Sequence, residues 1–242
     1  MDLSERQIQI LKCVVEEFTE TAEPVGSETL DKKYNLGVSP ATIRNEMVQL
    51  TKIGLLKQPH TSAGRIPTPQ AIKMYIRELM KEKELSVSEE VAVKERVWDH
   101  RFEVEKLLRE ATRCLAERTS ALSIAVTDDN RVYHAGYTHI LEMPEFFDID
   151  VTRSVLSLLE ESQALLEVFK KATGEEAVHI LVGEELGSRY FEPVGLVFTD
   201  LKMGPRNGSL GVIGPARLNY PYVIPMVRYF GNLLNEIAQD WQ

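Results

Sequence analysis

The sequence lacks any long hydrophobic run and has very little cysteine, and these two absences exclude different classes of protein. No stretch approaches the ~18 consecutive apolar residues of a transmembrane helix, so we expect no membrane span. The start, MDLSERQIQIL, is polar and acidic, unlike the basic and then apolar start of a signal peptide. The 2 cysteines, Cys13 and Cys114, lie far apart within apolar helical patterns, which predicts buried free thiols rather than a disulfide. We therefore expect a cytoplasmic protein.

The patterns that usually accompany catalysis or metal binding are also missing. The 5 histidines show no ligand spacing of the HxxxH or CxxC kind. The glycines of GSLGVIGP fall at 208, 211 and 214, which is not the GxGxxG spacing of a nucleotide-binding loop. Glu184 and Glu185 follow an apolar strand, but no histidine or serine elbow accompanies them. We expect no enzyme activity, no cofactor and no metal.

The chain does contain a strongly basic segment within an acidic protein. Its 242 residues are 43% hydrophobic and 27% charged, as in a globular protein of one or two domains, and the net charge is −9. Residues 32–77 nevertheless hold eight basic side chains against Glu46 alone, a net +7, whereas residues 1–31 carry −6 and the rest −10. Phosphate affinity depends on the field within roughly 8–10 Å, so this segment favours nucleic-acid binding.

The segment Ser39–Thr68 has the pattern of a recognition helix followed by a basic hairpin. Ser39 can cap a helix whose first residue is Pro40, and Ile43, Met47 and Leu50 share one buried stripe. Short polar groups and a guanidinium then face outward, as base edges and phosphates require. The pattern predicts a winged helix-turn-helix that contacts DNA through Ser39, Thr42, Arg44, Asn45, Gln49, Lys52, His60, Thr61, Ser62 and Arg65.

Neighbouring patterns complete a head of residues 1–83. We expect helices at residues 4–22 and from Ser27, a short Gly-containing turn before Ser39, two short strands around Leu56 and Ile66, and a fourth helix from Thr68 or Pro69. Residues 84–118 are charged and helical, and their apolar stripe predicts either a connector or a dimer seam. The stripe is formed by Phe102, Leu107, Leu108, Ala111 and Leu115.

Residues 119–242 predict an α+β sheet domain. SALSIAV and RVYHAGY flank the turn residues Asp128–Asn130 and indicate a hairpin, and residues 150–173 indicate a helix. Three apolar β-type runs follow, VHILVGE, PVGLVFTDL and SLGVIGPARL, and a last helix begins near Tyr222. Strands with flanking helices in this order are typical of an α+β fold.

Five segments resemble one known family, the heat-inducible transcription repressor HrcA family: PVGSETL, SPATIRNEM, PHTSAGRIPT, VYHAGYTHILEMPEF and GSLGVIGPARLNY. The resemblance implies a winged helix joined to a GAF-like α+β domain. It also implies a homodimeric repressor of chaperone genes that binds an inverted-repeat operator and is released under heat stress. In that family the chaperonin GroEL is the partner that keeps the repressor competent.

The centre of the chain departs from the family pattern. Members usually carry further strands and an inserted dimerisation domain before the segment that matches VYHAGYTHILEMPEF, whereas only about a dozen residues stand there in this chain. Residues 119–242 are therefore predicted to be a GAF-like dimerisation and regulatory domain without the usual insert. The dimer interface and the response to GroEL stay open. The alternative function is a metabolite-responsive regulator whose GAF-like domain binds a small ligand.

Overall fold

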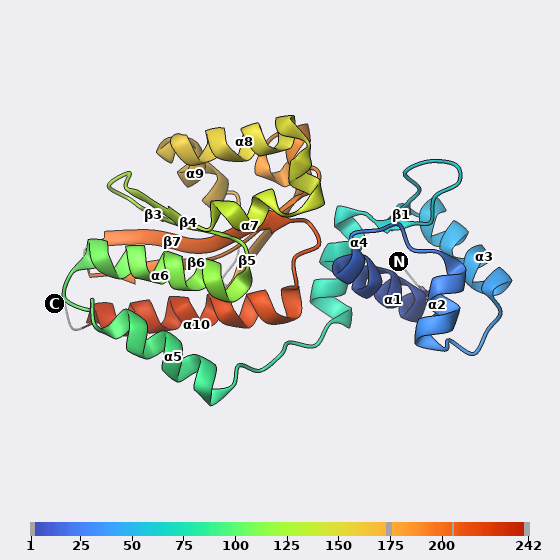
Figure 1. Ribbon diagram of the computed structural model, residues 1–242, viewed down its shortest axis with the longest axis horizontal. Helices are drawn as coiled ribbons and strands as arrows, with labels where there is room; N and C mark the ends of the chain where they lie inside the picture. Colours follow the sequence, from blue (N-terminus) through green and yellow to red (C-terminus); the bar gives the residue numbers. More distant parts are fainter. Residues whose placement is uncertain (1–2, 173–175, 205, 240–242) are drawn as a thin grey trace. The chain divides into compact units, whose positions relative to one another are not determined.

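A computed structural model describes residues 3–172, 176–204 and 206–239, and its first helix begins with the predicted capping box (Figure 1). The Ser4 hydroxyl accepts a hydrogen bond from the Gln7 N–H at 3.3 Å, and the Gln7 side-chain oxygen accepts from the Ser4 N–H at 3.1 Å. Two N–H groups that a helix start leaves without partners are thereby satisfied. Helix α1 (Glu5–Thr21) ends where Ala22 takes a left-handed conformation with φ 60°.

Residues Met1–Lys81 form the first of two compact units. After α1 come α2 (Ser27–Tyr34), α3 (Pro40–Lys52), β1 (Leu56–Lys57), β2 (Ile66–Pro67), α4 (Pro69–Met74) and the π-helical turn η1 (Tyr75–Leu79). The three helices enclose a core to which α3 contributes the predicted stripe of Ile43, Met47 and Leu50. Ser39 caps α3 and Pro40 begins it, so the sequence prediction for this helix is confirmed.

The hairpin of the first unit is held at its base by a third segment. Strands β1 and β2 pair antiparallel, Leu56 with Pro67 and Lys57 with Ile66. Val25, in the turn between α1 and α2, exchanges two backbone hydrogen bonds with Arg65, at 2.8 and 2.9 Å. Three short segments thus form a small sheet, and this arrangement is the wing of a winged helix.

Residues Glu82–Gln242 form the second unit, which is built on a five-stranded antiparallel sheet in the order β4-β3-β7-β6-β5. The strands are β3 (Leu122–Thr127), β4 (Val132–Ala135), β5 (His179–Val182), β6 (Val194–Met203) and β7 (Arg206–Pro215). β3 pairs with β4 through the predicted hairpin, and it also pairs with β7, about eighty residues further along the chain.

Helices cover both faces of this sheet (Figure 1). Helices α6 (Val104–Thr119) and α10 (Tyr220–Gln239) lie on one face, and α5 (Val87–Trp98) packs against them. The other face packs against α7 (Tyr137–Leu141), α8 (Ile149–Glu160) and α9 (Ser162–Phe169). Because neither face meets water, β3 is buried at every position, and its sequence does not alternate between apolar and polar residues.

Several boundaries differ from the sequence predictions. The expected helix 150–173 is two helices, because Glu161 has φ −106° and ψ 88° and breaks the ladder; residue 173 itself lies outside the described residues. The second hairpin strand stops at Ala135, because Gly136 turns the chain with φ +92°. The last helix starts at Tyr220 rather than Tyr222. Three 3₁₀ turns were not predicted: η2 (Pro144–Phe147), η3 (Gly183–Leu186) and η4 (Arg189–Phe191).

The apolar stripe predicted in residues 84–118 packs against the core of the second unit. Leu107, Leu108, Ala111 and Leu115 are fully buried by the unit's own sheet and helices, which favours the connector over the dimer seam. Phe102 does not share this stripe, because it lies in the bend between α5 and α6, and three quarters of its surface is exposed.

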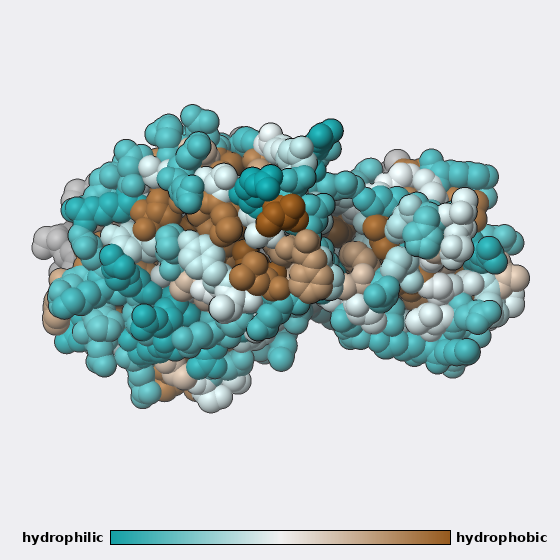
Figure 2. Space-filling view, turned by 45° about the horizontal axis from the view of Figure 1, so that its top comes forward, coloured by the Kyte–Doolittle hydropathy of each residue, from teal (hydrophilic) through white to brown (hydrophobic). Residues whose placement is uncertain are grey.

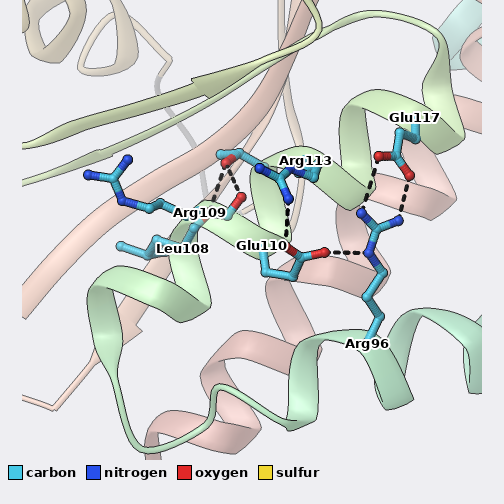
Figure 3. Close-up of polar contacts among 7 residues, drawn as sticks. Arg96, Leu108, Arg109, Glu110, Arg113 and Glu117 are labelled. Carbon is cyan, nitrogen blue, oxygen red and sulfur yellow. Dashed lines mark hydrogen bonds and ion pairs between the residues drawn. The ribbon is translucent and has the colours of Figure 1, made fainter.

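A polar network joins α5 to α6 on the outside of the second unit (Figure 3). Arg96 of α5 donates from Nε to Glu110, and its two Nη groups donate to the two oxygens of Glu117 at 2.5 and 3.1 Å. Arg113 lies 3.7 Å from Glu110. The guanidinium of Arg96 lowers the pKa of Glu117, which accepts two hydrogen bonds in the ionised form.

Replacing Glu117 by glutamine is expected to lower the free energy of unfolding of the second unit by about 0.5 kcal/mol at neutral pH, since the pair is half exposed. Because the folded-state pKa of Glu117 is lowered, its ion pair stabilises the fold fully above the usual glutamate pKa of about 4.3, and this stabilisation is lost as the pH falls through the lowered folded-state pKa. Urea unfolding should therefore show a larger difference from the unsubstituted chain at roughly pH 7 than at roughly pH 3. An equal difference in the free energy of unfolding at both pH values would contradict a stabilising ion pair between Arg96 and Glu117.

The segment that leads into the second unit is fastened to α10. Pro225 lies inside α10 and has no N–H, so the Pro221 carbonyl loses its usual helical partner. The Lys83 N–H donates to that carbonyl at 2.7 Å. Arg228, one turn further on, holds both oxygens of Glu82 at 2.6 and 2.7 Å. The proline that interrupts the helix thus provides the attachment point of the segment.

Cys13 and Cys114 are both buried and free, as predicted, and they belong to different units. Burial raises the pKa of the Cys13 thiol to about 11, and burial also raises the pKa of Cys114. Among the described residues, no helix is both long and apolar enough to cross a membrane.

Candidate nucleic-acid interface

The outer face of α3 carries the side chains that the sequence assigned to base and phosphate contacts. Arg44, Asn45, Gln49 and Lys52 are exposed, while every third or fourth residue between them is buried in the core. Since residues three and four apart share a helix face, these four side chains form one polar surface along the length of α3. The structure therefore brings them together as expected.

The first turn of α3 uses its polar residues locally. The Ser39 hydroxyl accepts a hydrogen bond from the Thr42 N–H at 3.2 Å and lies 3.0 Å from the Thr42 hydroxyl. Ser39 is exposed, and Thr42 is half-buried. Both residues thus shape the start of the helix, and a contact between either of them and DNA stays a prediction.

The only acidic residue of the basic segment, Glu46, is held by α1. It accepts a hydrogen bond from the Gln7 amide at 3.1 Å, and Arg6 lies 3.7 Å away. The basic neighbour of Glu46 therefore comes from a different helix than α3. With Glu46 engaged by α1, the outer face of α3 keeps its positive character.

The wing loop is shaped by Gln58, a residue that the sequence analysis did not identify. Its amide donates to the carbonyls of Thr61 and Ala63, at 3.0 and 2.9 Å, and so bridges the loop. His60, Thr61 and Ser62 remain exposed at the tip, where the Ser62 hydroxyl lies 3.3 Å from the His60 ring nitrogen. No local pattern distinguishes Gln58 from any exposed glutamine, because its partners are set by the loop conformation.

Arg65 connects the wing to the recognition helix. Its Nε donates to the Thr51 hydroxyl of α3 at 3.1 Å, and its Nη1 donates to the carbonyls of Ala63 and Gly64 at 3.4 and 3.3 Å. Thr51 in turn donates to the Met47 carbonyl. Arg65 therefore has a structural role that the sequence did not indicate, and its contact with DNA stays a prediction.

A cavity of about 320 Å³ opens between α2, α3 and the wing. Its wall includes the first turn of α2, whose cap residue Gly26 has no side chain to satisfy the free N–H groups. Arg44 and Arg65 face the same space, together with one acidic residue, Glu28. Two guanidinium groups beside a helix N-terminus favour an anion such as a phosphate.

No group of three or more His, Cys, Asp or Glu side chains that could hold a metal occurs within the described ranges 3–172, 176–204 and 206–239. The donors of the basic surface are amides, hydroxyls, guanidinium groups and an ammonium. Such a set binds base edges and phosphates.

Two family models match this chain, and together they span most of it. Residues 2–82 match the model described as the winged helix-turn-helix transcription repressor, HrcA DNA-binding, and residues 46–224 match that of the HrcA protein C terminal domain. The chain belongs to the HrcA family. The recognition from short motifs and the predicted fold class, a winged helix-turn-helix followed by an α+β sheet domain, are confirmed.

Curated HrcA relatives match this chain from near one end of each sequence to near the other. A heat-inducible transcription repressor HrcA of Symbiobacterium thermophilum is 29% identical, with 97% of this chain and 98% of the relative covered. One of Moorella thermoacetica is 28% identical, with 99% of each covered. A crystal structure of a hypothetical protein, 19% identical, superposes with a TM-score of 0.80 over 100% of both chains and supports the fold.

The relatives contain residues that this chain does not have. The comparison with the Symbiobacterium HrcA extends over 336 positions, whereas this chain has 242 residues. At least 94 positions, the difference between these lengths, therefore have no counterpart here. In this chain, β3 and β4 are joined by a tight turn, with Asn130 in a left-handed conformation (φ 63°).

Proposed function

We propose that this protein is a homodimeric DNA-binding repressor of heat-shock genes that binds an inverted-repeat operator in the cytoplasm and is released under heat stress. The observation that supports it best is the continuous polar and basic surface formed by α3 and a wing that Arg65 ties to it, in a member of the HrcA family. Two identical heads related by a two-fold axis would match the two halves of an inverted repeat.

In the proposed complex, α3 lies in the major groove. Arg44, Asn45 and Gln49 contact base edges, and Lys52 contacts phosphate near the end of the helix. Ser39 and Thr42 lie at the helix start, within reach of the backbone. The wing residues contact backbone or minor groove through His60, Thr61, Ser62 and Arg65.

The cavity beside α2 fits a backbone phosphate in this arrangement. It adjoins both the recognition helix and the wing, and it offers Arg65 and the N-terminus of α2 to the same anion. A phosphate there would fix the head on the duplex without reading sequence.

The second unit is proposed to pair two copies and to receive the signal. The family resemblance implies the chaperonin GroEL as the partner that maintains repression. We further propose that the 94 or more positions present only in the relative include the inserted dimerisation domain, so that the dimer of this chain forms through other residues.

A second candidate is regulation by a small ligand. A cavity of about 380 Å³ beside the extended ends of β6 and β7 combines apolar Leu166 and Phe169 with polar Asp200, Lys202 and Ser209. Apolar walls with a few convergent polar groups are typical of metabolite sites. A thermal-shift screen of small metabolites without any stabilising compound would count against this candidate.

The proposed function is tested by operator binding. We expect the full chain to bind a chaperone-gene inverted repeat with an affinity that falls steeply with salt, since several phosphates are neutralised. Lys52→Ala should make the slope of log affinity against log salt less steep by about 1 unit. The control is a duplex of equal length with both half-sites scrambled. Equal affinity for both duplexes would refute sequence-specific repression.

Mapping bound sites across the genome, with and without heat stress, tests the regulatory part. Chaperone promoters that are occupied before stress and released after it would support the proposal. Occupancy at other promoters alone would leave a winged-helix regulator with a different set of genes.

A further inference from the structure

Five large apolar side chains on α7, η2, α8 and η4 of the second unit are turned to solvent. Hydrophobic surface, drawn brown in Figure 2, gathers over this unit with hydrophilic residues around it. We define the apolar surface by residues of α7, η2, α8 and η4 with their exposed fractions: Leu141 (53%), Phe147 (71%), Ile149 (63%), Leu156 (37%) and Tyr190 (40%).

These residues come from elements that adjoin one another. α7 packs on η2, and α8 packs on both η2 and η4. Ile149 and Leu156 are seven residues apart and therefore lie on the same face of α8. Arg189, next to Tyr190, interacts electrostatically with Asp150 in the first turn of α8, so η4 lies beside the start of that helix.

Folding of the unit does not account for this exposure. The same elements fill the core with a second set of side chains, which includes Ile140, Phe146, Val151 and Val155. Phe146 is 3% exposed, whereas the adjacent Phe147 is 71% exposed. Each element thus has one apolar side for the core and another for solvent, a pattern typical of interaction surfaces.

The exposed area matches one side of a stable dimer. Side chains of this size present roughly 150–200 Å² each when free, so five that are on average half exposed present on the order of 450 Å². A standard interface buries ~800 Å² on each partner, of which ~55–65% is apolar, or roughly 450–500 Å². A pair of such surfaces would therefore form an interface of ordinary size.

Charges of both signs border the surface. Glu142, Asp148 and Asp150 are acidic, and Arg153 and Arg189 are basic. Arg153 lies 2.8 Å from Asp150 in the same helix, and Arg189 also interacts with Asp150, so both signs lie together at this border. A second copy of this chain would present the same mixture of charges across a two-fold axis. A membrane or a nucleic acid would instead select one sign. The mixed rim and the apolar centre are therefore complementary to a second copy of this chain.

We infer that this apolar surface is the two-fold dimer interface of the protein and that it pairs the chain in place of residues found only in the longer relatives. The inference rests on the proposed homodimeric function, which it deepens by naming the interface. It places Phe147 and Ile149 at the centre and the charged residues at the rim.

The test uses the full chain and measures self-association by sedimentation equilibrium without DNA. Phe147→Asp and, separately, Ile149→Asp are expected to raise the dimer dissociation constant at least ~30-fold, because each two-fold interface contains the substitution twice. Phe102→Asp is the matched control. Phe102 is 75% exposed but lies at the bend between α5 and α6, outside the apolar surface. The Phe102→Asp substitution should leave the dimer dissociation constant unchanged.

Three results would overturn the inference: a monomeric unsubstituted chain, an unchanged dimer in both variants, or dissociation caused by Phe102→Asp alone. Circular dichroism and thermal unfolding that match the unsubstituted chain would show that the exposed substitutions leave the fold intact.

Binding to a single operator half-site separates the inference from the proposed function. A monomeric variant should keep half-site affinity and lose the additional affinity for the inverted repeat. If neither the unsubstituted chain nor any variant binds DNA, the repressor function is refuted. The dimer interface is still tested by the sedimentation measurements.

Discussion

Arg44→Ala is expected to weaken operator binding by about 1–3 kcal/mol, which is roughly 5–150-fold in affinity, if Arg44 reads a base. The side chain is exposed on α3 beside the cavity between α2 and the wing. The unfolding temperature of the head should therefore stay the same. A gel-shift titration at fixed salt, with the unsubstituted chain in parallel, measures the effect.

Two control variants decide what kind of contact Arg44 makes. Lys12→Ala removes one positive charge from α1, where Lys12 lies 3.9 Å from Glu16, and it should change affinity little. Arg44→Lys keeps the charge but loses the planar fork that bonds two base atoms. If Arg44 reads a base, the lysine variant should bind nearly as weakly as the alanine variant. If it holds a phosphate, lysine should restore most of the affinity. Unchanged operator affinity in Arg44→Ala would refute both a base contact and a phosphate contact of Arg44.

The parts of the fold that sequence predicted are those determined by neighbouring residues. The capping box of Ser4 and Gln7 and the Ser39–Pro40 helix start each depend on contacts within one turn, so composition and spacing are sufficient. Hydrophobic spacing likewise identified the buried stripe of α3. These patterns placed the outward residues of the recognition helix on one face, because the same periodicity fixes both sides of a helix.

The parts that could not be predicted depend on residues far apart in the chain. Apolar runs indicated β3 and β7, but nothing in them showed that the two strands pair, since any two such runs could. The same applies to the candidate site. Thr51 and Arg65 are separated by β1 and the wing loop, so their hydrogen bond is visible only once β1 and β2 are paired. Arg65 was therefore assigned to DNA alone.

The wing glycine is a position where sequence showed a motif and the structure supplies the physical reason. A Cβ placed on Gly64 would lie 2.3 Å from the Val25 carbonyl oxygen and 2.8 Å from that of Pro24. Both are backbone atoms, so neither can move without shifting the turn between α1 and α2. The two hydrogen bonds between Val25 and Arg65 form at the same place. Glycine here permits the close approach that holds the wing to the head.

Gly64→Ala is expected to lower the free energy of unfolding of the first unit by about 2–3 kcal/mol, because two backbone hydrogen bonds of about 1 kcal/mol each are disrupted and a backbone clash must be relieved. Urea unfolding followed by circular dichroism measures the change. Operator affinity should fall as well, since Arg65 would no longer be held against Thr51 of α3.

Gly26→Ala is the matched control, because Gly26 lies on the other side of Val25. A Cβ at Gly26 would meet its nearest neighbour, the Thr29 hydroxyl, at 3.7 Å, an ordinary contact. This variant should lower the free energy of unfolding of the first unit by only about 0.5–1 kcal/mol, the usual effect of alanine at a helix cap. If Gly64→Ala proves no more destabilising than Gly26→Ala, the wing is not held by its contact with Val25. The geometry of the proposed DNA-binding surface would then have to come from the loop bridge of Gln58 and from Arg65 alone.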